Sequence, residues 1–209
     1  MKQLKNLLLL TLLFLPFAGT ILSCSEQLDE ETDEYANWKA RNEAYIANIA
    51  NKYQRLKTFT KDQTAEGNIS DYVYYEVLEH HDELEQQGKE SESPYYTDTV
   101  RVSYRGHLIP TTSDPEGYVF DQTYKGEFDW QTTGAAASPM NGLVDGFTTA
   151  LLHMHRGDRW RIYIPYHLGY NMTSKTGIPI YSTLIFDIAL IDFTHPGYSM
   201  PRWSARTER

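Results

Sequence analysis

The side chains most suited to chemistry in this 209-residue sequence are a single cysteine and a pair of adjacent histidines. Cysteine can act as a nucleophile or a metal ligand, and histidine binds metals when further ligands stand at suitable spacing. Cys24 is the only cysteine, which excludes a disulfide framework and a zinc site built from cysteines. His80 and His81 lie in a polar segment, residues 79–94, where adjacent histidines are usually exposed to solvent. We therefore expect neither a bound metal nor catalysis by an activated nucleophile.

Cys24 stands at the end of a targeting segment. Lys2 and Lys5 precede an apolar run over residues 7–17, which is too short for a membrane-spanning helix and is typical of a secretory signal peptide over residues 1–23. Residues 21–24, Ile-Leu-Ser-Cys, resemble a bacterial lipobox, which implies that Cys24 is acylated. Each buried methylene of such a lipid contributes about 0.8 kcal/mol to membrane binding. An ordinary signal peptide with an incidental cysteine is the alternative.

Residues 24–34 combine this cysteine with a run of acidic side chains, and we expect them to form an extended tether. The run also resembles the acidic stretches of surface-exported lipoproteins in some Gram-negative bacteria. The sequence therefore predicts a lipoprotein of the outer membrane in a Gram-negative cell envelope, facing either the periplasm or the outer surface.

The remaining composition favours one folded domain. The hydrophobic fraction of 41%, with 16 Tyr, 8 Phe and 4 Trp, is enough for a packed core. The net charge of −9, from 19 basic and 28 acidic residues, argues against nucleic acid as a partner, since phosphate binding needs an excess of Lys and Arg. No stretch after residue 23 has the roughly 20 apolar residues that a membrane helix needs.

An N-terminal helix is predicted over residues 33–57, capped by Thr32 and uninterrupted by Pro or Gly. Its apolar stripe contains aromatic and aliphatic side chains at spacings of three, four and seven. The stripe consists of Tyr35, Trp38, Tyr45, Ile49, Tyr53 and Leu56. We expect residues 35–67 to form a helical extension. Residues 58–71 are rich in turn-forming side chains and are expected to be a connection to the next strand.

The chain beyond this extension is predicted to be an α+β domain. Strands are expected over residues 72–78, 99–108, 159–165 and 183–193, with one short helix over residues 146–155. Consecutive strands lack the regular helical crossovers of a parallel sheet. A bent antiparallel sheet wrapped around the single helix fits this order best.

Five blocks of sequence then resemble one family in the correct order. Residues 100–108 resemble the strand pattern V-x-V-x-Y-x-G-x-L, and residues 120–123 resemble F-D-S-S. Residues 142–147 resemble V-I-x-G-W, residues 164–170 resemble I-P-x-x-L-A-Y, and residues 177–188 resemble I-P-P-x-x-T-L-x-F-x-V. These are the blocks of FK506-binding-protein (FKBP) type prolyl isomerases.

The resemblance covers residues 70–193 and implies an FKBP-like fold over residues 68–194, followed by a C-terminal tail over residues 195–209. It also implies peptidyl-prolyl cis-trans isomerase activity without a cofactor or metal. Rotation of an X-Pro bond has a barrier of about 18–20 kcal/mol, because resonance gives the amide partial double-bond character. A dry apolar pocket favours the less delocalised, twisted amide, and donors that fit only this geometry bind it further.

The resemblance also implies a site. Its lining consists of Tyr104, Phe120, Asp121, Phe128, Val144, Phe147, Tyr170 and Phe186, with Leu143 and Ile178 at its rim. Phe147 would form the floor, and the backbone amide of Val144 and the hydroxyl of Tyr170 would bind substrate carbonyls. Asp121 would hold a polar group of the pocket by a hydrogen bond. Plain core packing is the alternative for each aromatic ring.

Several positions depart from the family pattern. Phe147 replaces the usual Trp, Gly142 stands where Glu or Gln is common, and Asn171 replaces a Gly. The loops at 109–119 and 131–142 are each about six residues longer than in a minimal domain. A catalytically weak or inactive module that binds peptides or proteins is therefore the alternative function, and a lipoprotein of a glycan-uptake system is a third.

The expected partners are proline-containing segments of unfolded or extended envelope proteins, and the membrane through the lipid on Cys24. In larger relatives an N-terminal helical extension makes a dimer, so a dimer through residues 33–57 is conceivable. We expect a monomer instead, in which this helix either packs its stripe on its own domain or extends the tether.

Overall fold

The computed structural model describes residues 33–82 and 92–201 of the chain. The expected signal peptide, the acylation site at Cys24 and nearly all of the acidic tether lie outside these ranges, as does most of the predicted C-terminal tail. The described residues from Glu34 onward belong to one compact unit. Within the described ranges, no helix has both the length and the apolar character needed to cross a bilayer.

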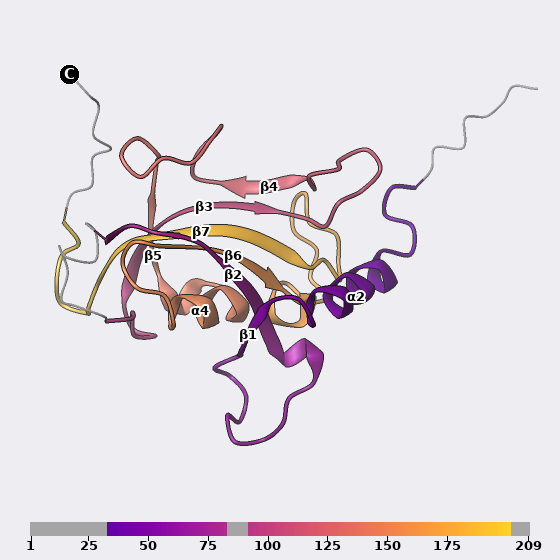
Figure 1. Cartoon of the computed structure of the whole chain (residues 1–209), viewed down its shortest axis with the longest axis horizontal. Helices are drawn as coiled ribbons and strands as arrows, with labels where there is room; N and C mark the ends of the chain where they lie inside the picture. The colour runs from indigo at the N-terminus through magenta and orange to yellow at the C-terminus, as the bar shows by residue number, and fades with distance from the viewer. Residues whose placement is uncertain (1–32, 83–91, 202–209) are drawn as a thin grey trace, which may run out of the picture. The chain divides into compact units, whose positions relative to one another are not determined.

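The described part of the chain forms a seven-stranded sheet in the order β1-β2-β6-β7-β3-β4, with β5 also paired to β3 (Figure 1). Every strand pair is antiparallel. The strands are β1 Gln54–Lys57, β2 Tyr72–His80, β3 Thr99–His107, β4 Val119–Gln122, β5 Ala136–Pro139, β6 Asp158–Ile164 and β7 Leu184–Thr194. The helices are α2 Trp38–Ile49 and α4 Asp145–Leu151, with short 3-10 turns η1 Ile69–Asp71, η2 Met140–Gly142 and η3 Tyr166–Leu168. This confirms the predicted α+β class and antiparallel sheet.

Helix α4 lies against one face of the sheet (Figure 1), and all of its residues after Asp145 are buried. Gly146 allows this close approach, because a Cβ atom there would lie 2.3 Å from Cγ2 of Ile164 in β6. The helix ends at Leu151, four residues earlier than predicted. The four predicted strands are present as β2, β3, β6 and β7, whereas β1, β4 and β5 were not predicted.

The N-terminal helix is shorter than the predicted range of residues 33–57. It begins at Trp38, after Asn37 in a left-handed conformation with φ of 54°, and it ends at Ile49. Residues 54–57 instead form β1, which pairs with residues 72–75 of β2. The backbone hydrogen bonds of this ladder outweigh the good helix propensity of Gln, Arg, Leu and Lys, so part of the expected helical extension belongs to the sheet.

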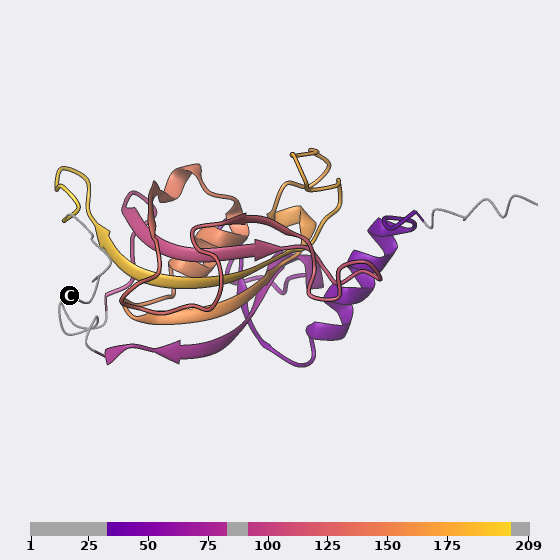
Figure 2. The same ribbon diagram turned by 90° about the horizontal axis from the view of Figure 1, so that it is seen from above.

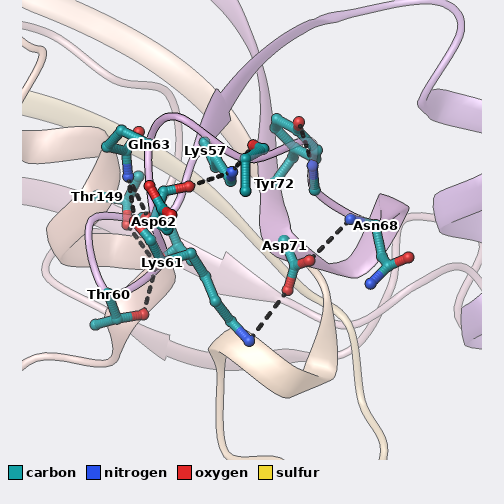
Figure 3. Close-up of polar contacts among 12 residues, drawn as sticks. Lys57, Thr60, Lys61, Asp62, Gln63, Asn68, Asp71, Tyr72 and Thr149 are labelled. Atoms are coloured by element: carbon teal, nitrogen blue, oxygen red, sulfur yellow. Dashed lines mark hydrogen bonds and ion pairs between the residues drawn. The ribbon is translucent and has the colours of Figure 1, made fainter.

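The connection between β1 and β2 is held by its own polar groups (Figure 3). Lys57 Nζ donates to the backbone oxygens of residues 62 and 65, and Lys61 forms an ion pair of 3.4 Å with Asp71. Asp71 also caps η1 by accepting the backbone N–H of Asn68 at 2.8 Å. In α4, Thr149 Oγ1 lies 3.2 Å from Thr58 Oγ1. The connection is thus fixed to the helix that carries the candidate site.

Candidate functional site

Four predicted site residues form one aromatic cluster, which we call the Phe186 cluster: Tyr104 of β3, Phe120 of β4, Phe147 of α4 and Phe186 of β7. Ring centroids of Phe186 lie 5.0 Å from Phe147, 5.3 Å from Phe120 and 6.0 Å from Tyr104, all edge to face. Phe147 and Phe186 are 5% and 6% exposed, whereas Tyr104 and Phe120 are half-buried. The elements that the sheet brings together therefore build an apolar site with two rings inside and two reaching solvent.

Gly106 makes room for these rings. It stands opposite Phe186 in the β3–β7 register and next to β4. A Cβ atom at this position would lie 2.5 Å from Phe186 and 2.7 Å from Phe120, which is closer than atoms can pack. The glycine of the strand pattern is thus required because two rings lie directly on the backbone of β3.

Asp121 is held toward this cluster by a hydrogen bond from the Tyr104 hydroxyl to Asp121 Oδ2 at 2.7 Å. The pairing of β3 with the end of β4 fixes both groups, because Thr123 N donates to Tyr104 O at 2.9 Å and Thr123 Oγ1 accepts from Tyr104 N at 2.9 Å. Burial, and next the hydrogen bond to Asp121, raise the pKa of Tyr104 well above its ordinary value. The sequence predicted that Asp121 holds a polar group, but Thr123 as the clamp was missed, although it follows directly in the same block.

Tyr170 is half-buried against the same core and supplies a second phenol. Its hydroxyl makes no hydrogen bond within the described part of the chain, so it is available to a ligand. Burial first, and the negative charge of Asp121 second, raise the pKa of Tyr170. Both phenols of the site therefore stay protonated at neutral pH, and Tyr170 can donate a hydrogen bond to a carbonyl oxygen.

Val144 is the N-cap residue of α4 and is half-buried. The N–H of an N-cap residue takes no part in the helix hydrogen bonds, and this position allows it to donate to a ligand. Leu143 beside it is half-buried, whereas Ile178 is only 5% exposed. Ile178 closes a turn in which its N–H and carbonyl bond to Lys175, and its side chain packs against the hydrophobic core.

Phe128 is not part of the Phe186 cluster. Asp187 follows Phe186 in β7 and so points to the opposite face of the sheet, where Arg161 Nε and Nη2 donate to it at 2.6 and 2.8 Å. Arg159 also approaches Asp187 on that face, and its guanidinium lies 4.4 Å from the centroid of the Phe128 ring. The structure thus places Phe128 across the sheet from the other predicted lining residues.

A second aromatic group, which we call the Phe128 cluster, consists of Tyr124, Phe128 and Trp130 with two arginines. Phe128 meets Tyr124 at 5.6 Å and Trp130 at 5.0 Å, both edge to face. Arg105 lies over Tyr124 at 4.7 Å, as Arg159 lies over Phe128. The strand that follows, β5, pairs with β3 and carries only Ala, Ser and Pro side chains. Strand β5 therefore contributes no aromatic ring to the Phe186 cluster.

The histidine pair lies at the end of β2 and not in an exposed loop. His80 Nδ1 lies 2.7 Å from Asp158 Oδ1 of β6, and the His80 side chain is 31% exposed. His81 is half-buried, and its ring lies 5.4 Å from Trp130. His80 is thus exposed as expected, although it lies in β2 and contacts Asp158, whereas His81 is half-buried and not exposed. Among the described residues, no group of three or more His, Cys, Asp or Glu could hold a metal ion.

Known proteins resemble this chain in sequence. The model of the family "FKBP-type peptidyl-prolyl cis-trans isomerase" matches residues 90–191. The macrophage infectivity potentiator of Trypanosoma cruzi is 38% identical over 177 residues, which cover 84% of this chain and 79% of that protein. FkpA of Escherichia coli strain K12, an FKBP-type peptidyl-prolyl cis-trans isomerase, is 31% identical over 146 residues, or 69% of this chain and 46% of the relative. The chain thus spans about half the length of the E. coli relative.

Solved structures resemble the fold. The crystal structure of FkpA from E. coli has a TM-score of 0.52 at 28% identity and covers 77% of this chain and 62% of that chain. A peptidyl-prolyl cis-trans isomerase from Pseudomonas syringae pv. tomato DC3000 has a TM-score of 0.54 and covers 77% of this chain and 96% of that chain. Its identity of 19% shows the shared fold alone.

Proposed function

The chain belongs to the family of FKBP-type peptidyl-prolyl cis-trans isomerases, and from this membership we propose that it isomerises peptide bonds preceding proline. The observation that carries the proposal is the Phe186 cluster, which places buried rings beside the Tyr104 phenol that is hydrogen-bonded to Asp121. Tyr170 packs against the same core and is close enough to Asp121 for the charge of that carboxylate to raise its pKa. Such a site can bind a proline ring and remove water from the amide that precedes it.

The barrier is lowered by binding and not by covalent chemistry. The planar amide owes its resonance to a charge-separated form, and the amide loses this resonance when it twists. Where Phe147 and Phe186 exclude water, the charge-separated form is poorly stabilised, so the site favours the twisted amide. The Tyr170 hydroxyl and the Val144 N–H then donate to carbonyl oxygens of the substrate. Donors that fit the twisted amide better than the planar one accelerate the reaction, because only differential binding raises the rate.

A second candidate function is binding without turnover. It is favoured by the position of Phe128 across the sheet and by the small side chains of β5, which leave the site with fewer rings than the resemblance implies. Phe147 stands in place of the usual Trp, and its smaller ring gives the site a smaller floor. A domain of this kind would hold an extended proline-containing segment without accelerating its isomerisation.

Exchange spectroscopy by NMR on a short Ala-Leu-Pro-Phe peptide separates the two functions. With the purified chain in mild detergent, we expect cis–trans exchange to rise well above the uncatalysed rate, which has a time constant of tens of seconds or more. A folded protein that shifts the peptide resonances without accelerating exchange would support the binding module and contradict the isomerase.

We further propose that the substrates are proline-containing segments of unfolded or extended envelope proteins, and that a lipid on Cys24 anchors the protein. The support is the lipobox-like sequence before Cys24 and the acidic run after it. The location is then the outer membrane of a Gram-negative envelope, at its periplasmic or outer face.

Fractionation of cells tests the anchor. Cys24→Ala should release the protein from the membrane fraction or stall its processing, because the acylated side chain is removed. A variant that fractionates and migrates like the parent would contradict acylation at this position.

A further inference from the structure

Helix α2 makes buried hydrogen bonds to the segment that carries Ile178, a predicted rim residue. Asn42 in the middle of α2 is fully buried. Its Oδ1 accepts the backbone N–H of Thr183 at 2.7 Å, and its Nδ2 donates to the backbone oxygen of Trp38 at 2.8 Å. A buried amide of this kind is satisfied only while helix and segment stay together, and leaving it unpaired is costly.

A second contact extends this connection toward Ile178. The indole Nε1 of Trp38 donates to Ser182 Oγ at 2.9 Å, and Ser182 Oγ donates to the backbone oxygen of Pro179 at 2.7 Å. Pro179 is the direct neighbour of Ile178. The hydrogen bonds therefore run without interruption from the helix to the residue beside the rim.

The segment itself contains a strained residue. Tyr181 has φ of 62°, a left-handed conformation that a bulky side chain rarely adopts. Its backbone N–H bonds to the carbonyl of Asn171 at 2.9 Å. Such a conformation persists only where the surroundings determine it, and here Asn42 and Trp38 hold the two residues that follow Tyr181.

The same helix also contacts the long loop at 109–119. Arg41 donates to the backbone oxygens of Glu34 at 2.6 Å and Pro110 at 3.5 Å. Tyr118 of this loop lies against Gly177, where a Cβ atom would be 2.9 Å from its ring. Figure 2 shows the loop between β3 and β4 beside α2. The N-terminal helix thus braces two loops that lead into the Phe186 cluster.

We propose that α2 is a positioning element of substrate binding, with Asn42 and Trp38 as the positioning residues that hold Ile178–Thr183 in the binding conformation. The inference rests on the proposed isomerase function. A contact made at the rim, away from the bond that rotates, should bind planar and twisted amides alike. We therefore expect loss of the Asn42 and Trp38 hydrogen bonds to weaken substrate binding and to leave the turnover of bound substrate unchanged. The hydrogen bonds of Asn42 and Trp38 to residues 182 and 183 lie within one chain, so the helix positions a loop of its own domain.

The test compares Asn42→Leu and Trp38→Phe with Leu190→Ala, a core substitution in β7 outside the site. Leucine has the branching and the number of side-chain heavy atoms of asparagine but makes no hydrogen bonds, and phenylalanine keeps a ring without the indole donor. On the whole chain in mild detergent, NMR titration with the Ala-Leu-Pro-Phe peptide gives Kd and the exchange rate at saturation. Amide hydrogen exchange measures the protection of residues 178–183.

We expect Asn42→Leu to raise Kd about three- to tenfold and Trp38→Phe to raise it about two- to threefold. The exchange rate at saturation should stay within about twofold of the parent rate in both variants. Protection of residues 178–183 should fall in both variants, and Leu190→Ala should change neither Kd nor this local protection in its folded fraction. An unchanged Kd in Asn42→Leu, or an equal rise in Leu190→Ala, would overturn the inference. A parent that binds without turnover would contradict only the isomerase, because Kd still decides the role of α2. A parent protein that neither binds the peptide nor accelerates its exchange would overturn both the isomerase function and the role of α2.

Discussion

The two aromatic clusters lie on opposite faces of one sheet and differ in what covers their rings. In the Phe186 cluster, rings pack on rings, and Phe147 and Phe186 are buried. In the Phe128 cluster, the rings are half-buried and two of them lie under the guanidinium groups of Arg105 and Arg159. An aromatic side chain therefore has two uses here, as a wall of a dry site and as a cover for a charged sheet face. The difference depends on the neighbours and not on the residue type.

Removal of one ring from each cluster should give the largest contrast. Phe186→Ala should lower the free energy of unfolding by about 3–5 kcal/mol and abolish activity, because it leaves a cavity among buried rings. Phe128→Ala should cost only about 1 kcal/mol, since its ring is partly exposed and its cation–π contact is weak in water. Urea unfolding and peptide exchange measure both effects. Equal losses in the two variants would show that Phe128 belongs to the site after all.

Gly106→Ala should have the second-largest effect, because the new Cβ atom would overlap with Phe120 and Phe186. We expect a loss of about 1–3 kcal/mol in unfolding free energy, typical of overpacking, and a clear loss of activity. Gly142→Ala is the matched control, since nothing lies within 4 Å of its Cβ position. Its stability should stay within about 0.5 kcal/mol of the parent. A harmless Gly106→Ala would contradict the close packing of the rings on β3.

Tyr170→Phe should change the rate more than the stability. The substitution keeps the ring and removes a hydroxyl that has no partner within the described residues. A hydrogen bond made to the substrate is worth about 0.5–1.5 kcal/mol, so exchange should slow about two- to tenfold at an unchanged midpoint of urea unfolding. Full activity in this variant would remove Tyr170 from the proposed donors.

Alkaline pH should give the smallest effect. The pKa of Tyr104 and that of Tyr170 are raised in the folded protein, first by burial. The folded state holds these protons more tightly than the unfolded chain, whose tyrosines titrate near pH 10. Their contribution to stability is therefore fully present below about pH 10 and is lost as the pH rises toward the raised values. Tyr104→Phe should flatten this fall in urea unfolding between pH 9 and 11, and an unchanged slope would contradict the shift.

The sequence was sufficient for the strands and motifs whose pattern follows from local chemistry. The long apolar strands around Phe186 and the helix with Gly146 are confirmed in place because alternation and spacing specify them. The role of Asp121 was instead implied by the resemblance to the FKBP family. Asp121 was expected to hold a polar group, and the Tyr104 hydroxyl is that group.

The rest depended on tertiary pairing that no local pattern encodes. Residues 54–57, Gln-Arg-Leu-Lys, have no strand signature and form β1 only because β2 offers a free edge. Residues 136–139 form β5 with small side chains for the same reason. Phe128 stands in a long loop, and only the course of that loop decides which face of the sheet its ring reaches.

The short strands at both margins of the sheet limit how this protein can hold another polypeptide. At one margin lies β1, with Arg55 and Lys57, and at the other lie β4 and β5, of which β5 ends in Pro139. Each has only four residues, and brevity, positive charge and proline all hinder the addition of a foreign strand. An extended chain therefore finds little free backbone for strand addition at β1, β4 and β5. Its recognition then depends on contacts in the site and not on a new strand of the sheet, and it can be released without dismantling a ladder.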